Sequence, residues 1–195
     1  MTPAPYRKST HKKGEPSRTR GGFFYFSGEA LIPHGGITRP VLQYRYMMTT
    51  KPLAGTRVLD LTRVLAGPFA TMLLNDLGAD VLKVEMPGVG DDSRHFGPFK
   101  NDRSLYFISI NRGKQSMTLN LKTEEGKQIL RKLVAEYDVL VENFRPGVME
   151  KLGLGYEDLK EINPRLVYAA SSGYGHTGPD SKKPAYDILA QATGG

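Results

Sequence analysis

The 195-residue sequence contains no cysteine and no tryptophan, and it holds no run of about eighteen apolar residues. The lack of cysteine excludes a disulfide framework and favours a reducing compartment. The lack of a long apolar run means that no transmembrane helix is expected. These absences predict a cytoplasmic protein without a membrane partner, and a mitochondrial location stays open as an alternative.

Acidic residues are scarce near the N-terminus. Residues 1–50 hold eight Lys and Arg against two Glu, so this segment carries +6 of the formal net charge of +7. It is rich in Pro and Gly and shows no sustained hydrophobic period, which predicts a basic, disordered extension. An arm that binds RNA or an acidic partner and a targeting peptide remain alternatives. The remaining chain is nearly neutral, so no nucleic-acid partner is predicted.

The glycine fingerprint of dinucleotide-binding proteins is also missing. The stretch RVLDLTRVLAGPFATMLLNDLGADVLKVE at 57–85 has the pattern of a strand (56–61), a helix (67–78) and a second strand (79–85). Its turn holds one glycine, Gly67, and no G-x-G-x-x-G. Four apolar residues of the helix share one face and are predicted to be core: Phe69, Met72, Leu73 and Leu77.

The alternation of strands and helices continues after a long polar loop at 86–103. The run SLYFISINRGKQSMTLNL at 104–121 predicts two short strands around a turn, and Thr123 is expected to cap the next helix. That helix should bury Ile129, Leu130, Leu133, Val134 and Tyr137. Helices are predicted at 124–137, 146–153 and 156–163, and strands at 138–144 and 165–175.

This alternation predicts an α/β fold with a Rossmann-like, doubly wound parallel sheet. In such folds ligands bind at the edge where the carboxyl ends of the strands lie. The loops expected at that edge are 62–68, 85–94, 142–147 and 171–179. We therefore expect the binding residues in these four loops.

Seven sequence blocks occur in an order and spacing that identify a family. They are RVLDLTRVLAGPFA, LGADVLKVE, GDDSR, SLYF followed by NRGKQS, DVLVENFRPG, LGLGYEDL and AYDILAQATGG. Together they resemble the N-terminal half of the family III CoA-transferases of the CaiB/BaiF type, and they are formyl-CoA transferase-like. The resemblance runs from about Lys51 to Gly195. It implies that 51–195 is a CoA-binding Rossmann-like domain, cut short before the family's small domain.

The resemblance implies coenzyme A as substrate and carrier, and no metal. CoA phosphates can be met by cationic side chains and main-chain amides, so the missing glycine fingerprint agrees with this ligand. Where many relatives place an Arg after the second strand, this sequence has Met86, and Arg94 is a possible substitute. The other CoA-contacting positions implied by the resemblance are Leu65, Ala66, Leu119, Asn120, Leu121, Lys122, Asn143, Phe144, Arg145, Lys151, Ala185, Tyr186 and Asp187.

The same resemblance implies a reaction that moves CoA from an acyl-CoA to a carboxylic acid through an aspartyl-CoA intermediate. The nucleophilic Asp is expected beyond Gly195, so no catalytic residue is assigned within the sequence. In the related α-methylacyl-CoA racemases, an Asp at the position of Asp187 works with a His, but that second position holds Ala170 here. A transferase is therefore favoured over the two alternatives, a racemase-like enzyme and a non-catalytic CoA-binding fragment.

Complete chains of the family are about twice as long, and two of them interlock as a homodimer. The resemblance therefore implies that this chain is incomplete and inactive alone. The expected small-molecule partners of the whole protein are an acyl-CoA and a carboxylic acid.

Overall fold

The computed structural model describes residues 51–194, and its centre is a five-stranded parallel sheet. The predictions for residues 1–50 lie outside the described residues. The strand order is β5-β2-β1-β6-β7, and every neighbouring pair is parallel. Their bounds are β1 Arg57–Asp60, β2 Asp80–Glu85, β5 Gln115–Thr118, β6 Val139–Glu142 and β7 Val167–Ala170.

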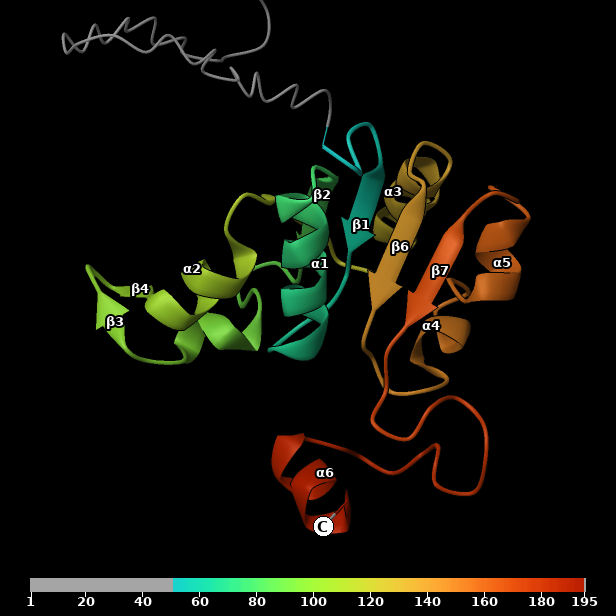
Figure 1. The fold of residues 1–195 in the computed structure, drawn as a ribbon. Helices are drawn as coiled ribbons and strands as arrows, with labels where there is room; N and C mark the ends of the chain where they lie inside the picture. The colour runs from blue at the N-terminus through green and yellow to red at the C-terminus, as the bar shows by residue number, and fades with distance from the viewer. Residues whose placement is uncertain (1–50, 195) are drawn as a thin grey trace, which may run out of the picture. The chain divides into compact units, whose positions relative to one another are not determined.

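The chain winds outward from β1 to β5 and then returns to place β6 on the other side of β1. The reversal between β1 and β6 is the topological switch point of a doubly wound sheet. Figure 1 shows β6 beside β1 and β7 beside β6, with the strand arrows pointing the same way. The predicted Rossmann-like α/β fold is confirmed.

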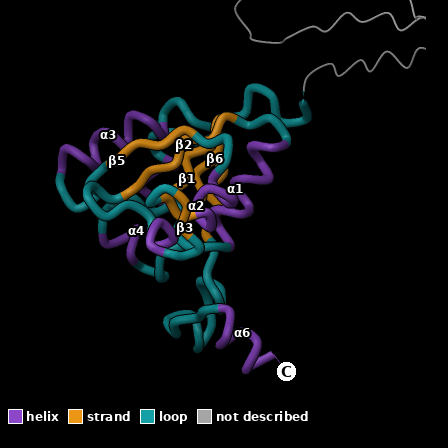
Figure 2. Tube along the Cα trace, turned by 90° about the vertical axis from the view of Figure 1, so that its left-hand side faces the viewer, coloured by secondary structure: helices purple, strands orange, loops and turns teal. Residues whose placement is uncertain are grey.

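Helices cover both faces of the sheet because successive strand residues point to opposite sides. On one face Val58, Val81 and Val141 pack with Leu74 of α1, which spans Ala66–Asp76. On the other face lies the larger core, built with α3 (Glu124–Val134), α4 (Val148–Lys151) and α5 (Tyr156–Lys160). Figure 2 shows the strands between helices on two sides.

Local sequence signals set several of the helix ends. Thr123 accepts a hydrogen bond from the Gly126 amide at 3.2 Å, so the predicted N-cap of α3 is confirmed. Pro68 lies in the first turn of α1, where a missing amide hydrogen costs nothing. Gly78 follows the end of the same helix with a φ of 108°, a conformation that favours glycine.

The prediction of a strand in the first part of 104–121 was wrong. Leu105–Asn111 forms the helix α2, although its aromatic and β-branched residues favour strands. Ser104 caps this helix by accepting a hydrogen bond from the Phe107 amide at 3.0 Å. Ile110 is buried, and α2 packs against α1. The cap and this packing outweigh the strand propensity.

The predicted buried face of α1 was also wrong in three of four positions. Met72 is 4% exposed, but Phe69, Leu73 and Leu77 are 45–47% exposed in the described structure. The helix instead turns Thr71 toward the sheet, where its hydroxyl donates a hydrogen bond to the buried Asp60. On α3, Ile129 is likewise exposed, whereas the other four residues predicted for its stripe are buried or half-buried.

The long loop at 86–103 contains structure of its own. The short 3-10 helix η1 spans Asp92–His95, and a small antiparallel hairpin follows it. The hairpin strands are β3 (Phe99–Lys100) and β4 (Arg103–Ser104). A last helix, α6, spans Asp187–Gly194 and has no buried residue.

Candidate functional site

A cavity of about 350 Å³ opens where the carboxyl ends of β1 and β2 meet the loop after β5 and the start of α4. This is the edge at which the sequence predicts ligand binding. Its walls are mainly apolar side chains: Leu61, Val84, Met86, Leu119, Leu121, Phe144, Val148 and Leu152. The size and the apolar walls are those of a small-molecule site.

Two cationic residues border this apolar cavity, Arg63 and Lys122. The Arg63 guanidinium lies 5.2 Å from the centre of the Phe144 ring and 3.9 Å from the Asp92 carboxylate. Its side chain is 44% exposed, so it remains accessible to a ligand. An apolar cleft with guanidinium and ammonium groups at its border suits a ring system that carries phosphate.

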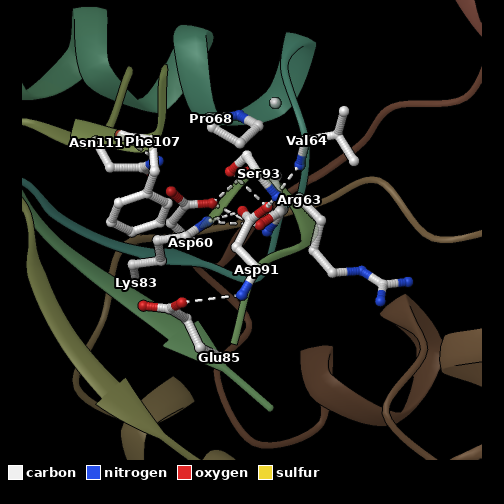
Figure 3. Close-up of polar contacts among 12 residues, drawn as sticks. Asp60, Arg63, Val64, Pro68, Lys83, Glu85, Asp91, Ser93, Phe107 and Asn111 are labelled. Carbon is white, nitrogen blue, oxygen red and sulfur yellow. Dashed lines mark hydrogen bonds and ion pairs between the residues drawn. The ribbon is translucent and has the colours of Figure 1, made fainter. Parts of the chain in front are cut away.

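The turn after β1 is held by side chains from other elements. Asn143, which follows β6, accepts a hydrogen bond from the Arg63 amide and donates one to the Arg63 carbonyl, each at 2.8 Å. Asp91 accepts a hydrogen bond from the Val64 amide at 3.1 Å. Figure 3 shows Asp91 beside the turn that carries Arg63 and Val64.

A buried ion pair supports the same turn. The Lys83 ammonium lies 2.8 Å from the Asp91 carboxylate, and their side chains are 1% and 0% exposed. Lys83 also donates a hydrogen bond to the Thr62 carbonyl at 2.8 Å. Burial alone would raise the pKa of Asp91, but the Lys83 ammonium and Ser93 hydrogen bonds lower it below its ordinary value. Asp91 is therefore ionised at neutral pH and is neutralised by Lys83.

A second buried ion pair lies beneath the start of α1. The Lys114 ammonium is 2.8 Å from the Asp60 carboxylate and donates hydrogen bonds to Asn111, Thr71 and the Pro68 carbonyl at 2.8–2.9 Å. Burial is the main cause of a lowered pKa for Lys114, and the Asp60 carboxylate opposes it. The pair joins β1, α1 and α2 at one point.

Arg94 forms a bidentate pair with Glu85, at 2.6 Å from Nε and 2.7 Å from the second nitrogen, and stacks on the Phe107 ring at 3.8 Å. Burial favours a raised pKa for Glu85, but Arg94 and Ser116 outweigh it and lower the pKa. Arg94 borders a smaller hollow of about 200 Å³ that also touches Glu85, Met86 and Gly90. These three residues also line the main cavity.

The carboxylates that line the main cavity are therefore already paired. Glu85 is bound by Arg94, and Asp91 is bound by Lys83. Such paired carboxylates neither repel a ligand's phosphates strongly nor serve as free nucleophiles. The arrangement suits binding of an anionic nucleotide rather than covalent chemistry at this point.

The structure brings five of the sequence-predicted CoA residues to the main cavity: Leu119, Asn120, Leu121, Lys122 and Phe144. Leu65 and Ala66 are exposed at the start of α1, and Arg145 is exposed after β6. Asn143 touches the turn after β1 through its two hydrogen bonds to Arg63. Lys151 is the exposed last residue of α4.

The remaining predicted residues are not part of the cavity lining. Tyr186 is 67% exposed, and Ala185 is half-buried with its Cβ close to Gly173. Asp187, the racemase-type candidate, begins α6 and accepts a hydrogen bond from Gln191 at 2.7 Å. Ala170 ends β7. Among residues 51–194, no His, Lys or second carboxylic acid forms a hydrogen bond with the Asp187 side chain.

Sequence reasoning missed Arg63 and the two buried lysines. Arg63 lies in the loop 62–68, which was expected to bind ligand, and a cationic residue in that loop could have been named as a phosphate contact. Lys83 lies among the apolar residues Val81, Leu82 and Val84 in the middle of β2, and a charge in that place indicates a buried partner. Asp91 could not be paired with it from the sequence, because the two residues meet only through the fold.

Within residues 51–194, no three His, Asp or Glu side chains gather closely enough to hold a metal ion. No helix in that part of the chain has the length and hydropathy needed to cross a bilayer.

Comparison with known proteins places these observations in a family. The family model described as CoA-transferase family III matches residues 53–195. Acetyl-CoA:oxalate CoA-transferase of Acetobacter aceti is 56% identical over 144 residues, which are 74% of this chain and 37% of that protein. Succinyl-CoA:glutarate CoA-transferase of Homo sapiens is 53% identical over 150 residues, or 76% of this chain and 34% of that protein. The match thus spans about a third of each curated relative.

A solved structure agrees with these relatives. The crystal structure of a CAIB/BAIF family protein from Brucella suis superposes with a TM-score of 0.71 and 48% sequence identity. The match covers 74% of this chain and 39% of that chain.

Proposed function

The chain belongs to CoA-transferase family III, and from this membership we propose that its cavity binds the nucleotide end of coenzyme A. The whole protein would move CoA between an acyl-CoA and a carboxylic acid. The observation that carries the proposal is the apolar cavity of about 350 Å³ at the carboxyl edge of the sheet, bordered by Arg63 and Lys122.

The walls of the cavity suit the adenine ring. Leu121, Phe144 and Val148 offer apolar surface from three different elements, and a flat heteroaromatic ring packs well on such surfaces. Apolar contact alone does not distinguish adenine from other rings. The charged border favours a ring that carries phosphate.

The border of the cavity suits the phosphates of CoA. Arg63 offers a planar fork of donors, and Lys122 offers a compact positive charge. Glu85 is paired with Arg94 and Asp91 with Lys83, so these carboxylates do not compete for Arg63 and Lys122. Arg63 has a long, exposed contact of 3.9 Å with Asp92, and phosphate can replace that contact. No glycine-rich cradle is required, because side-chain cations meet the phosphates in its place.

In the proposed reaction an enzyme aspartate attacks the acyl-CoA thioester. This attack forms a mixed anhydride and releases the CoA thiolate. The thiolate then attacks the aspartyl carbonyl of the anhydride, which yields an aspartyl-CoA thioester and frees the first carboxylic acid. The second carboxylic acid reverses these steps and leaves as its CoA thioester. None of the described residues is assigned as the nucleophile; their part is to hold the CoA nucleotide.

Filling the cavity should weaken CoA binding. Val148→Trp adds an indole to the cavity wall at the first residue of α4, and we expect at least a tenfold loss of CoA affinity from displaced ligand surface. Calorimetric titration of the purified chain with CoA measures it, with NAD as the competing dinucleotide. The wild-type chain should bind CoA more tightly than NAD.

The matched control is Val167→Trp. Val167 is 59% exposed and is the first residue of β7, so it lies at the amino end of the strand, away from the carboxyl ends where the cavity opens. This variant should keep wild-type CoA affinity. Equal affinity of the wild type and Val148→Trp for CoA would contradict the proposed site, and tighter binding of NAD would contradict the proposed ligand.

A further inference from the structure

Val64 has an unusual backbone conformation in the turn between β1 and α1. Among the described residues, three that are not glycine have a positive φ: Val64 at 71°, Asn101 at 49° and Asp102 at 57°. Asn and Asp tolerate this region, and both lie in the β3–β4 hairpin turn. A β-branched residue does not tolerate it well. Val64 therefore adopts this conformation because something else holds it there.

Two side chains are placed to hold it. Asn143 bonds both the amide and the carbonyl of Arg63, the residue before Val64, at 2.8 Å each. Asp91 accepts the amide of Val64 itself at 3.1 Å. Asp91 is in turn fixed by the Lys83 ammonium at 2.8 Å and by two Ser93 hydrogen bonds (Figure 3).

The two holding residues come from different parts of the fold. Asp91 belongs to the loop after β2, and Asn143 belongs to the loop after β6. β2 and β6 are the two neighbours of β1 in the sheet, so Asp91 and Asn143 bind the turn after β1 from its two sides. The turn carries Arg63, whose side chain borders the cavity and faces the Phe144 ring.

We propose that Asn143 and Asp91 are positioning residues that keep Val64 left-handed and thereby hold Arg63 at the cavity before ligand arrives. The ligand side of this inference rests on the proposed CoA function. In this role Asn143 acts on the ligand through the turn that carries Arg63. Because the turn is already ordered in the free protein, ligand binding loses less conformational entropy.

A double-mutant cycle between Asn143 and Val64 tests this mechanism. Asn143→Ala frees the Arg63 peptide groups, which lie in an exposed place and can be solvated, so the fold should persist. We call the Asn143 and Asp91 hydrogen bonds to residues 63 and 64 the clamp. When Asn143 is removed from the clamp, the backbone of Val64 should relax toward the right-handed region. The CoA affinity should then fall about tenfold, which corresponds to the usual cost of a left-handed non-glycine residue.

Val64→Gly provides the rescue. Glycine adopts a positive φ without a steric cost, so the turn can keep its conformation when the clamp is absent. We expect Val64→Gly alone to bind CoA within about threefold of the wild type, and Asn143→Ala with Val64→Gly to recover most of the lost affinity. A merely structural role of Asn143 would give additive losses instead.

Asn163→Ala is the matched control, because the Asn163 side chain, like that of Asn143, forms hydrogen bonds with backbone groups: it donates to the carbonyls of Val134 and Tyr137 at 3.0 and 2.9 Å. These bonds lie away from the cavity lining, so CoA affinity should be unchanged. Calorimetry with CoA and amide hydrogen exchange of residue 64 are the two readouts.

The outcomes distinguish a failure of the clamp from a failure of the proposed CoA binding. The clamp is supported when Asn143→Ala lowers affinity and speeds exchange of the Val64 amide, and Val64→Gly restores the affinity. It is overturned when the double variant binds no better than Asn143→Ala, or when Asn143→Ala leaves affinity unchanged. If wild-type protein does not bind CoA, the proposed function fails, and unaltered Val64 exchange in Asn143→Ala then overturns the clamp independently.

Discussion

Lys114→Met is expected to lower the free energy of unfolding by roughly 3–5 kcal/mol, the usual cost of removing one partner of a buried ion pair. The Lys114 and Asp60 side chains are 1% and 0% exposed, and their charged atoms lie 2.8 Å apart. Methionine fills much of the space of lysine but leaves the Asp60 carboxylate buried without its counter-ion. Urea unfolding followed by circular dichroism measures the loss.

The double variant Asp60→Asn with Lys114→Met identifies the cause. It removes the unpaired charge, so it should be more stable than Lys114→Met alone. Lys160→Met breaks the exposed pair between Lys160 and Glu157 and should cause no measurable loss. A single Lys114→Met variant as stable as the wild type would show that the pair contributes nothing.

Gly126→Ala should also destabilise the protein, by roughly 2 kcal/mol, although alanine normally favours a helix over glycine by about 1 kcal/mol. Gly126 lies in the first turn of α3, and a Cβ built there would meet the Asn120 carbonyl oxygen at 1.9 Å. That oxygen is backbone and cannot rotate away. The strand-to-helix loop at 119–122 would have to move, and this loop lines the cavity.

Gly126→Ala should therefore lower CoA affinity as well as stability. Gln128→Ala, an exposed substitution two residues later in α3, serves as the control because it changes helix propensity without that contact. Thermal unfolding and CoA titration of both variants give the comparison. A Gly126→Ala variant that is more stable than the wild type would contradict the close approach of α3 to Asn120.

Much of the fold could be predicted because its local signals agree with its tertiary structure. The strand RVLD, the cap at Thr123 and the glycine after α1 each favour one local conformation, and the fold satisfies all of them. The alternation of strands and helices then leaves few arrangements other than a doubly wound parallel sheet. The position of the cavity at the carboxyl edge follows from the same topology.

The errors arise where a polar contact between distant residues decides the outcome. Apolar spacing alone predicts Phe69, Leu73 and Leu77 of α1 as core, but the hydrogen bond of Thr71 to Asp60 turns another face inward. Segment 105–111 has strand propensity, yet its Ser104 cap and its packing on α1 make it helical. The Thr71–Asp60 hydrogen bond and the packing of α2 on α1 join residues far apart in the sequence, so a window of neighbouring residues does not show them. The Ser104 cap, in contrast, is local and was an available signal.

In the candidate site, too, some residues could be predicted from the sequence and others depend on contacts between distant parts of the chain. Leu119–Lys122 and Phe144 were expected from the family resemblance, and the structure places them around one cavity. Arg63 was not singled out, because nothing in its neighbours shows that Asn143 and Asp91 fix its turn. Pairings such as Lys83 with Asp91 depend on strand order, and strand order is a property of the whole sheet.

The central claim is that coenzyme A binds at the carboxyl edge of the sheet, and amide chemical-shift mapping during a CoA titration tests it most directly. Saturable shifts are expected for the turn at 63–66, for 119–122 and for Phe144, with little change at Val167 at the amino end of β7. Saturable binding that leaves all of these cavity amides unshifted, or no binding at all, would contradict it.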